Sequence, residues 1–310
     1  MNEIRTIEHT GEMEKQAGAL VSAYLAQLDA RPKTKDTYRK AVNRFFAWLM
    51  ERGSGTLSRA DILSYKAYLT KNYSASTVSA YLTALRSFFK YLESENYCYN
   101  VAAGIKGAEK SRGHKKDILT KEQAGAVLSV MDRTTAEGLR DYAIINLLMR
   151  TGLRTVEIER ANYEDIRQEA GQPLLYIQGK GRSDKDDFIV LTPATLDPLR
   201  EYINATGGRK DKAPIFQSMS NRSNGGRLTT RSISRIVKEA MRAAGIDNDR
   251  LTAHSLRHGA ITYALMSGAT LQEAQQLARH SNINTTLIYA HNLQRISSAP
   301  ESRIDSFLDA

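Results

Sequence analysis

The chain has 310 residues, and 44 Lys and Arg against 34 Asp and Glu give it a formal net charge of +10 and a pI near 9.5. The length suits about two domains, and the charge favours a polyanionic partner, which DNA, RNA or a membrane surface would each provide. The single cysteine, Cys98, excludes an internal disulfide framework and a cysteine-rich zinc site. The N-terminus lacks a signal-peptide pattern and no run approaches about 18 apolar residues, so we expect a cytoplasmic protein without a membrane partner.

Four amphipathic helices are predicted within residues 17–105, after a flexible N-terminus of residues 1–16. Pro32 ends the first helix, and Ser58 with Asp61 three residues later resembles a cap for the third. Together the helices predict a small all-α domain. The predicted helix starts are Ala17, Thr34, Ser58, and Ser76 or Thr77.

Positive charge is concentrated in this part of the chain. Residues 1–116 hold 19 basic and 11 acidic side chains, and six basic residues accompany one acid between Arg31 and Arg44. Such faces suit phosphate contacts and a major groove, although ordinary solvated helix faces are the alternative for any one residue. The candidate DNA contacts are Lys33, Lys35, Arg39, Lys40, Arg44, Arg86 and Lys90, together with Arg231 and Arg235 on a later helix.

Residues 106–116 form a predicted basic linker that either crosses DNA or serves solubility, and a second domain is predicted over 117–310. Thr120 with Gln123 predicts a capping box, and Asp141 to Met149 predicts a buried helix that ends before Gly152. Later helices are predicted at about 195–204, from Thr229 or Thr230, at 255–267, at 270–279 and near Tyr289. Three strand-like segments are predicted at about Tyr163–Ile166, Leu174–Gln178 and Asp187–Leu191.

Polar residues suited to phosphodiester chemistry gather between His254 and Tyr289. The order is TGLR ending at Arg154, GKG around Lys180, HSLRH from His254, LARH ending at His280, and Tyr289 nine residues later. As a set, these motifs resemble the tyrosine recombinases, the phage-integrase and Xer-like family, over nearly the whole chain. The resemblance implies a mainly α fold with a small three-stranded antiparallel sheet. It also implies a two-domain DNA clamp, with a helical core-binding domain and a mixed α/β catalytic domain.

Carried over by motif, the resemblance implies that Tyr289 attacks a DNA phosphate, giving a 3′-phosphotyrosyl link and a free 5′-hydroxyl. Two arginines, Arg154 and Arg257, would stabilise the charged phosphorane in place of a metal ion. His280 would donate a further hydrogen bond, and Lys180 would protonate the leaving oxygen. His254 is the candidate to accept or position the tyrosine proton. No cofactor and no metal are expected.

Several residues near these motifs have more than one interpretation. His254 and His258, four residues apart, could ligate a metal, but no partner glutamate or cysteine cluster accompanies them, so we interpret His258 as structural. Glu157 is predicted to support Arg154, with a simple salt bridge as the alternative. Lys180 competes with Arg182 and Lys185 in the same turn, and Tyr263 is interpreted as a core residue.

One departure from the family pattern lies before the second histidine. The family usually has glycine there, which fits a left-handed helix end, whereas this chain has Arg279. We expect the change to be tolerated, since the nine-residue step from His280 to Tyr289 is kept. The local turn that aims His280 is the part of the site that the change affects.

The resemblance predicts a site-specific recombinase of bacterial, phage or mobile-element origin. It would be a monomer in solution and a homotetramer on two double-stranded DNA sites, working through a Holliday junction, with an accessory directionality factor as a further partner. A C-terminal helix at about 300–310, with the apolar side chains Ile304, Phe307 and Leu308, would be exchanged between subunits or pack in cis. The alternatives are a type IB topoisomerase-like relaxing enzyme and a non-catalytic DNA-binding regulator.

Overall fold

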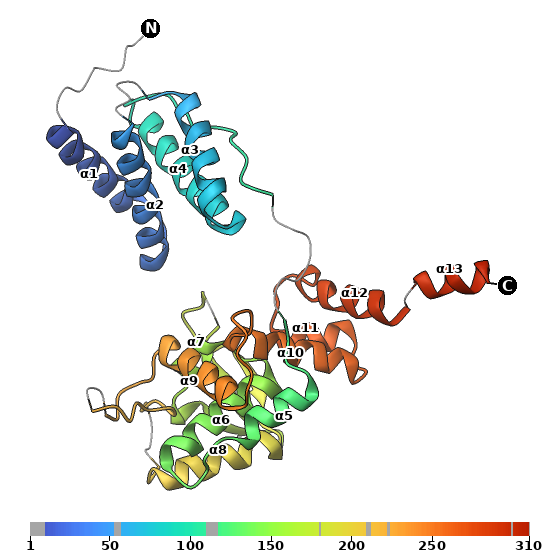
Figure 1. Cartoon of the computed structure of the whole chain (residues 1–310). Helices are drawn as coiled ribbons and strands as arrows, with labels where there is room; N and C mark the ends of the chain where they lie inside the picture. The colour runs from blue at the N-terminus through green and yellow to red at the C-terminus, as the bar shows by residue number, and fades with distance from the viewer. Residues whose placement is uncertain are drawn as a thin grey trace. The chain divides into compact units, whose positions relative to one another are not determined.

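A computed structural model describes residues 10–52, 57–109, 117–179, 181–208, 212–221, 224–298 and 300–309. The chain divides into two compact units between Arg112 and Gly113 (Figure 1). Within the described residues the structure is mainly helical, with one three-stranded antiparallel sheet, which confirms the predicted fold class. No helix in these ranges is long and apolar enough to cross a membrane.

The N-terminal unit packs four helices around an aromatic core. The ring of Phe45 lies 5.1 Å from Tyr65 and 6.0 Å from Phe89, both edge-on, and all three side chains are fully buried. Edge-on aromatic pairs add stability beyond their buried area. The helices are α1 (Thr10–Gln27), α2 (Pro32–Glu51), α3 (Arg59–Asn72) and α4 (Ala75–Ser94).

Three helix starts in this unit differ from the prediction, and one of them is α2, which begins at Pro32 rather than Thr34. Helix α1 begins at Thr10 rather than Ala17, and residues 1–9 lie outside the described residues. Helix α4 begins after Ser74, whose hydroxyl accepts a hydrogen bond from the Thr77 backbone amide at 3.3 Å. A serine earlier in the same polar run therefore supplies the cap. The predicted Ser58–Asp61 cap of α3 is present, at 2.9 Å.

The C-terminal unit is built around the buried helix α6 (Ala136–Thr151), which packs against α8, α9 and α10. Its run from Ala143 to Leu148 is fully buried, as the continuous apolar sequence predicted. The other helices of this unit are α5 (Lys121–Ser129), α7 (Thr155–Arg160), α8 (Pro193–Ala205), α9 (Thr230–Ala243), α10 (Ala253–Met266), α11 (Leu271–Ala278), α12 (Asn284–Ser298) and α13 (Pro300–Leu308).

The sheet has the order β1–β2–β3, with strands Ile166–Glu169, Gln172–Ile177 and Asp187–Val190. Ala170 and Gly171, both at positive φ, form the two-residue turn between the first two strands. The first strand was predicted too early. Residues Tyr163–Asp165 form a short 3₁₀ helix, because the Asp165 carboxylate accepts the Asn162 amide at 2.6 Å and closes a tight turn there.

Candidate active site

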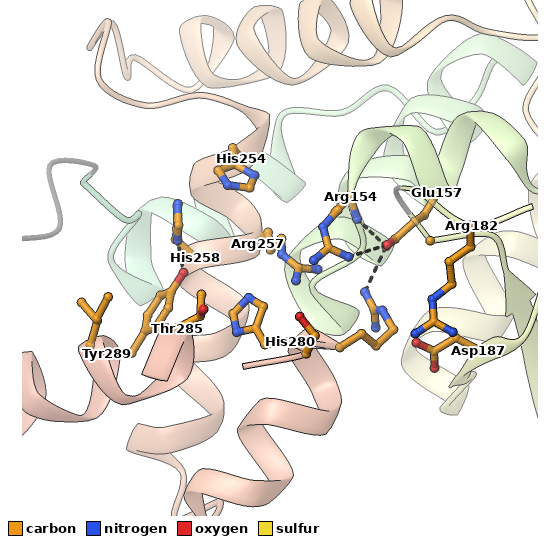
Figure 2. Close-up of a pocket in the computed structure, with 14 residues that line it drawn as sticks. Arg154, Glu157, Arg182, Asp187, His254, Arg257, His258, His280, Thr285 and Tyr289 are labelled. Atoms are coloured by element: carbon orange, nitrogen blue, oxygen red, sulfur yellow. Dashed lines mark hydrogen bonds and ion pairs between the residues drawn. The ribbon is translucent and has the colours of Figure 1, made fainter. Parts of the chain in front are cut away.

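Arg154 is placed by a sharp break between two helices. Helix α6 ends at Gly152, whose left-handed backbone (φ 60°) suits glycine, and Arg154 then caps the start of α7. The Glu157 carboxylate accepts the Arg154 backbone amide at 2.8 Å and its Nη1 at 2.7 Å. Because Glu157 is 1% exposed, it fixes both the main chain and the guanidinium of Arg154 from below the surface (Figure 2).

Arg257 comes from the first turns of α10 and is 2% exposed. It donates to the carbonyl oxygens of Gly152 and Ala278, so it joins the end of α6 to the end of α11. Burial lowers its pKa, and the neighbouring guanidiniums of Arg154 and Arg279 lower it further, to about 9. Arg257 therefore stays protonated at neutral pH.

His280 follows the left-handed end of α11. Its Nδ1 lies 2.9 Å from the hydroxyl of Thr286, a fully buried residue of α12. Burial lowers the pKa of His280, and Arg257, Arg154 and Arg279 add to the shift, which brings it to about 4. The imidazole is therefore neutral at pH 7, with one N–H to donate.

Tyr289 lies on α12 and packs against Ile261 and Ala278 with 5% of its surface exposed. Burial raises the pKa of its hydroxyl to about 12, although Arg257 opposes this shift. The hydroxyl contacts Nδ1 of His258, and Figure 2 shows the phenol and this imidazole pointing toward each other. The ring of His254 meets that of His258 edge-on at 4.5 Å.

These side chains share one cavity of about 520 Å³. Four guanidiniums, two carboxylates and the three histidines of the motifs line it beside Tyr289, so it carries an excess of positive charge. Such a cavity suits an anion whose charge increases during reaction. The charged and imidazole residues are Arg154, Arg182, Arg257, Arg279, Glu157, Asp187, His254, His258 and His280.

Five of the six residues that the sequence singled out as catalytic therefore lie together, namely Arg154, His254, Arg257, His280 and Tyr289. The sixth, Lys180, lies outside the described residues, whereas its neighbour Gly179 lines the cavity. Its two competitors in the turn each form an ion pair, although Arg182 also lines the cavity. Arg182 pairs with Asp186, and Lys185 pairs with the buried Asp165.

The structure adds an observation to the interpretation of His258 as structural, because this imidazole lines the same cavity. His258 contacts the Tyr289 hydroxyl, and the exposed His254 lies in the same cavity. Spacing along α10 puts both imidazoles on one face, and only the docking of α12 decides which of them meets the phenol. The i, i+4 histidine pair is the one sequence signal that could have identified His258. Among the residues that the structure describes, no cluster of metal-ligating side chains occurs.

The candidate DNA contacts fall into two groups. Lys33, Arg39, Lys40, Arg44, Lys90, Arg231 and Arg235 are exposed, and Lys35 is half-buried. Asp36 pairs with Lys40 at 2.8 Å, which offsets part of the charge on α2. Arg86 has a structural task, because its guanidinium donates to the Ile105 carbonyl at 2.9 Å and holds the chain that follows α4.

Comparison with known proteins gives a consistent result. A family model described as the phage integrase family matches residues 117–295, and one described as the phage integrase N-terminal SAM-like domain matches residues 20–100. The tyrosine recombinase XerD of Listeria monocytogenes serotype 4b is 31% identical over 258 residues, covering 80% of this chain and 84% of the relative. XerD of Rhizobium meliloti is 29% identical over 296 residues, covering 91% and 93%.

Solved structures share the fold. XerH recombinase bound to its palindromic difH substrate matches with a TM-score of 0.73 and 21% identity, covering 96% of this chain and 91% of that one. A lambda integrase tetramer bound to a Holliday junction matches with a TM-score of 0.65 and 16% identity, covering 88% and 81%.

Proposed function

The chain belongs to the phage integrase family of tyrosine recombinases, and from that membership we propose that it cuts and rejoins DNA at specific sites through a covalent link to Tyr289. The observation that carries the proposal is the buried Tyr289 hydroxyl, which shares a cavity with Arg154, Arg257 and His280. A phosphodiester is the substrate that matches a phenol nucleophile surrounded by guanidiniums.

The proposed reaction is a transesterification. The Tyr289 oxygen forms a bond to phosphorus, the bond from phosphorus to the 5′ oxygen breaks, and the DNA keeps a 3′-phosphotyrosyl end. The phenol proton passes to a base, and the leaving 5′ oxygen takes a proton from an acid. Attack by the 5′-hydroxyl of a second strand reverses the step, so the energy of the bond is conserved and no ATP is needed.

We assign the roles from geometry and charge. Arg154 and Arg257 bind the non-bridging oxygens, whose negative charge grows in the transition state. His280 Nδ1 lies 2.9 Å from the Thr286 hydroxyl. We assign the tautomer in which Nδ1 accepts from this hydroxyl, so that Nε2–H donates to the same phosphate. His258 receives the Tyr289 proton, and His254 packs against it. Lys180, which follows the cavity-lining Gly179 in the sequence, is the general acid.

DNA binding is proposed to involve both units. Residues 17–105 would form the core-binding domain and 117–310 the catalytic domain, joined by the basic residues 106–116. The solved relatives include a tetramer on a Holliday junction, which supports the same assembly on two paired sites for this chain. Exposed basic residues of α2 and α9 would contact phosphates.

A nicked suicide substrate tests the proposal. After cleavage, the short oligonucleotide with the free 5′-hydroxyl diffuses away, so religation is prevented and the covalent adduct accumulates. We expect the wild-type protein to form a covalent complex with DNA and Tyr289→Phe to form none. An equal amount of adduct in both proteins would reject Tyr289 as the nucleophile.

The same protein can be offered two paired sites and supercoiled DNA. Recombinant product supports the recombinase, relaxation without product would favour the topoisomerase-like alternative, and binding without any adduct would favour the non-catalytic regulator. EDTA is expected to leave the adduct yield unchanged, and strong inhibition would overturn the metal-free mechanism.

A further inference from the structure

We propose that Arg279 is a positioning residue that shares the Glu157 carboxylate with Arg154, so that the three side chains together present a net positive charge to the scissile phosphate. This inference rests on the proposed function. Arg279 stands where the family usually has glycine, immediately before His280. Its side chain is 7% exposed, and it donates to Glu157 Oε2 at 3.1 Å, on the opposite carboxylate oxygen from Arg154 Nη1.

The backbone of Arg279 indicates that the side chain has a specific task. It adopts φ 52° and ψ 46°, a left-handed conformation that is unfavourable for residues with a Cβ. A disfavoured backbone persists when its surroundings enforce it, and such residues cluster at functional sites. The contacts of the guanidinium provide that enforcement here. It donates to the carbonyl oxygens of Leu277 at 2.8 Å and of Gly152 at 3.2 Å, in addition to Glu157.

Arg279 connects the two arginines that we assign to the phosphate. The Gly152 carbonyl accepts from both Arg257 and Arg279, and the Glu157 carboxylate accepts from both Arg154 and Arg279. Its Nε is buried without an acceptor among the described residues, so its two terminal nitrogens make every one of these bonds. One rigid fork therefore ties the ends of α6 and α11 together.

Charge balance gives the connection a chemical consequence. Arg154 with Glu157 alone is a neutral pair, and a neutral pair attracts a phosphate weakly. Adding Arg279 gives the trio a net charge of +1, so Arg154 is free to act on the phosphate. Burial alone would raise the pKa of Glu157, but Arg279 and Arg154 hold it below its usual range, so the carboxylate is ionised.

The variant Arg279→Gly restores the residue that suits this backbone, and it should fold. In the suicide-substrate assay we expect its single-turnover cleavage rate to fall roughly 10- to 100-fold, as for other residues that orient a reacting group. Its DNA affinity should change by less than about threefold, because affinity is spread over many phosphate contacts. Arg279→Lys keeps the charge without the fork and should cleave at an intermediate rate.

A second substitution, Glu157→Gln, distinguishes a positioning role of Arg279 from a merely structural one, because only the positioning role predicts that it restores part of the cleavage rate. In Arg279→Gly with Glu157→Gln, Arg154 loses its neutralising partner while the amide still caps α7. We expect this double variant to cleave at least about fivefold faster than Arg279→Gly, whereas a merely structural role predicts a slower double variant. Ala170→Gly, at φ 48° in the β1–β2 turn, is the matched control for relief of left-handed strain and should cleave at the wild-type rate.

The outcomes separate this inference from the proposed function. Suppose that wild-type protein forms an adduct and Tyr289→Phe does not. A wild-type cleavage rate in Arg279→Gly, or a double variant slower than Arg279→Gly, would then overturn the proposed role of Arg279 and leave the proposed function intact. Absence of adduct with wild-type protein would instead reject the proposed function. Thermal melting of each variant, equal to wild type within a few degrees, ensures that the rates describe folded protein.

Discussion

The proposed nucleophile, Tyr289, is buried and protonated in the structure. Tyr289 is 5% exposed, and burial raises the pKa of its hydroxyl to about 12, so the phenol is protonated at neutral pH. A base must therefore take the proton as the phosphate is attacked. The contact with His258 supports the proposal that this imidazole is the base, whereas the motif alone suggested His254.

Substituting the two histidines separates their roles. His258→Gln should slow single-turnover cleavage by roughly 10²–10⁴, the range for loss of a general base, and His254→Gln should slow it less. His291→Gln, at an exposed position of α12, is the matched control and should cleave at the wild-type rate. A His254→Gln protein slower than His258→Gln would restore the original assignment.

The lowered pKa of His280 makes stability depend on pH. The ordinary pKa of 6.5 applies to the unfolded chain, whereas the folded value is about 4, so the unfolded state binds the proton first. The contribution of His280 to stability is therefore complete above pH 6.5 and is lost as pH falls toward 4. His280→Gln removes this contribution. Between pH 7 and 4, the free energy of unfolding measured in urea should fall less steeply in the variant than in the wild type. The same pH dependence in both proteins would contradict the lowered pKa of His280.

At the scale of elements, the sequence predicted the helices of the site well, because their caps and apolar periods are local. Gly152 ends α6, and Thr252 precedes α10, as the TGLR and HSLRH motifs require. The first strand was misplaced because the turn at Asn162–Asp165 depends on a side-chain bond that periodicity does not show. The choice between His254 and His258, and the contacts of Arg279, depend on how α10, α11 and α12 pack together.

The start of α6 is a sensitive point of this scaffold. A Cβ added at Gly138 would lie 1.6 Å from the carbonyl oxygen of Asp132, so Gly138→Ala must displace the backbone. We expect a loss of about 1–3 kcal/mol in the free energy of unfolding. Gly125→Ala in α5, with open space around it, should instead gain about 0.5–1 kcal/mol.

Circular dichroism and fluorescence can assign that loss to one unit. Trp48, the only tryptophan of the chain, reports on the N-terminal unit. In Gly138→Ala its fluorescence transition should stay in place while the transition seen by circular dichroism moves to lower urea. An unchanged free energy of unfolding in Gly138→Ala would contradict this prediction and would mean that the backbone at Asp132 moves without cost.

At the scale of the whole molecule, family membership and fold were recognisable from the order of the motifs, whereas assembly is decided by surfaces. Helix α13 forms the C-terminal end of the described chain (Figure 1). Its side chains Ile304, Phe307 and Leu308 are 57%, 81% and 73% exposed. A short helix with such a stripe is stable when it is buried against a partner. We propose that the partner is a neighbouring subunit on DNA.

Deleting residues 300–310 tests this proposal. We expect cooperative assembly on paired DNA sites to weaken, with binding of one protomer to one site unchanged, as measured by native gel shift and light scattering. Packing in cis would instead appear as a lower melting temperature of the C-terminal unit. An unchanged tetramer with unchanged stability would contradict both interpretations.

The central claim is that Tyr289 forms the covalent bond to the DNA 3′ phosphate, and the residue that carries this adduct can be identified directly. Trypsin cuts after Arg279 and Arg295, so residues 280–295 form one peptide in which Tyr289 is the only tyrosine. After trapping on a suicide substrate, nuclease digestion and tandem mass spectrometry, we predict a residual nucleotide mass on Tyr289 of this peptide. The same mass on another residue, with the 280–295 peptide unmodified, would contradict the account.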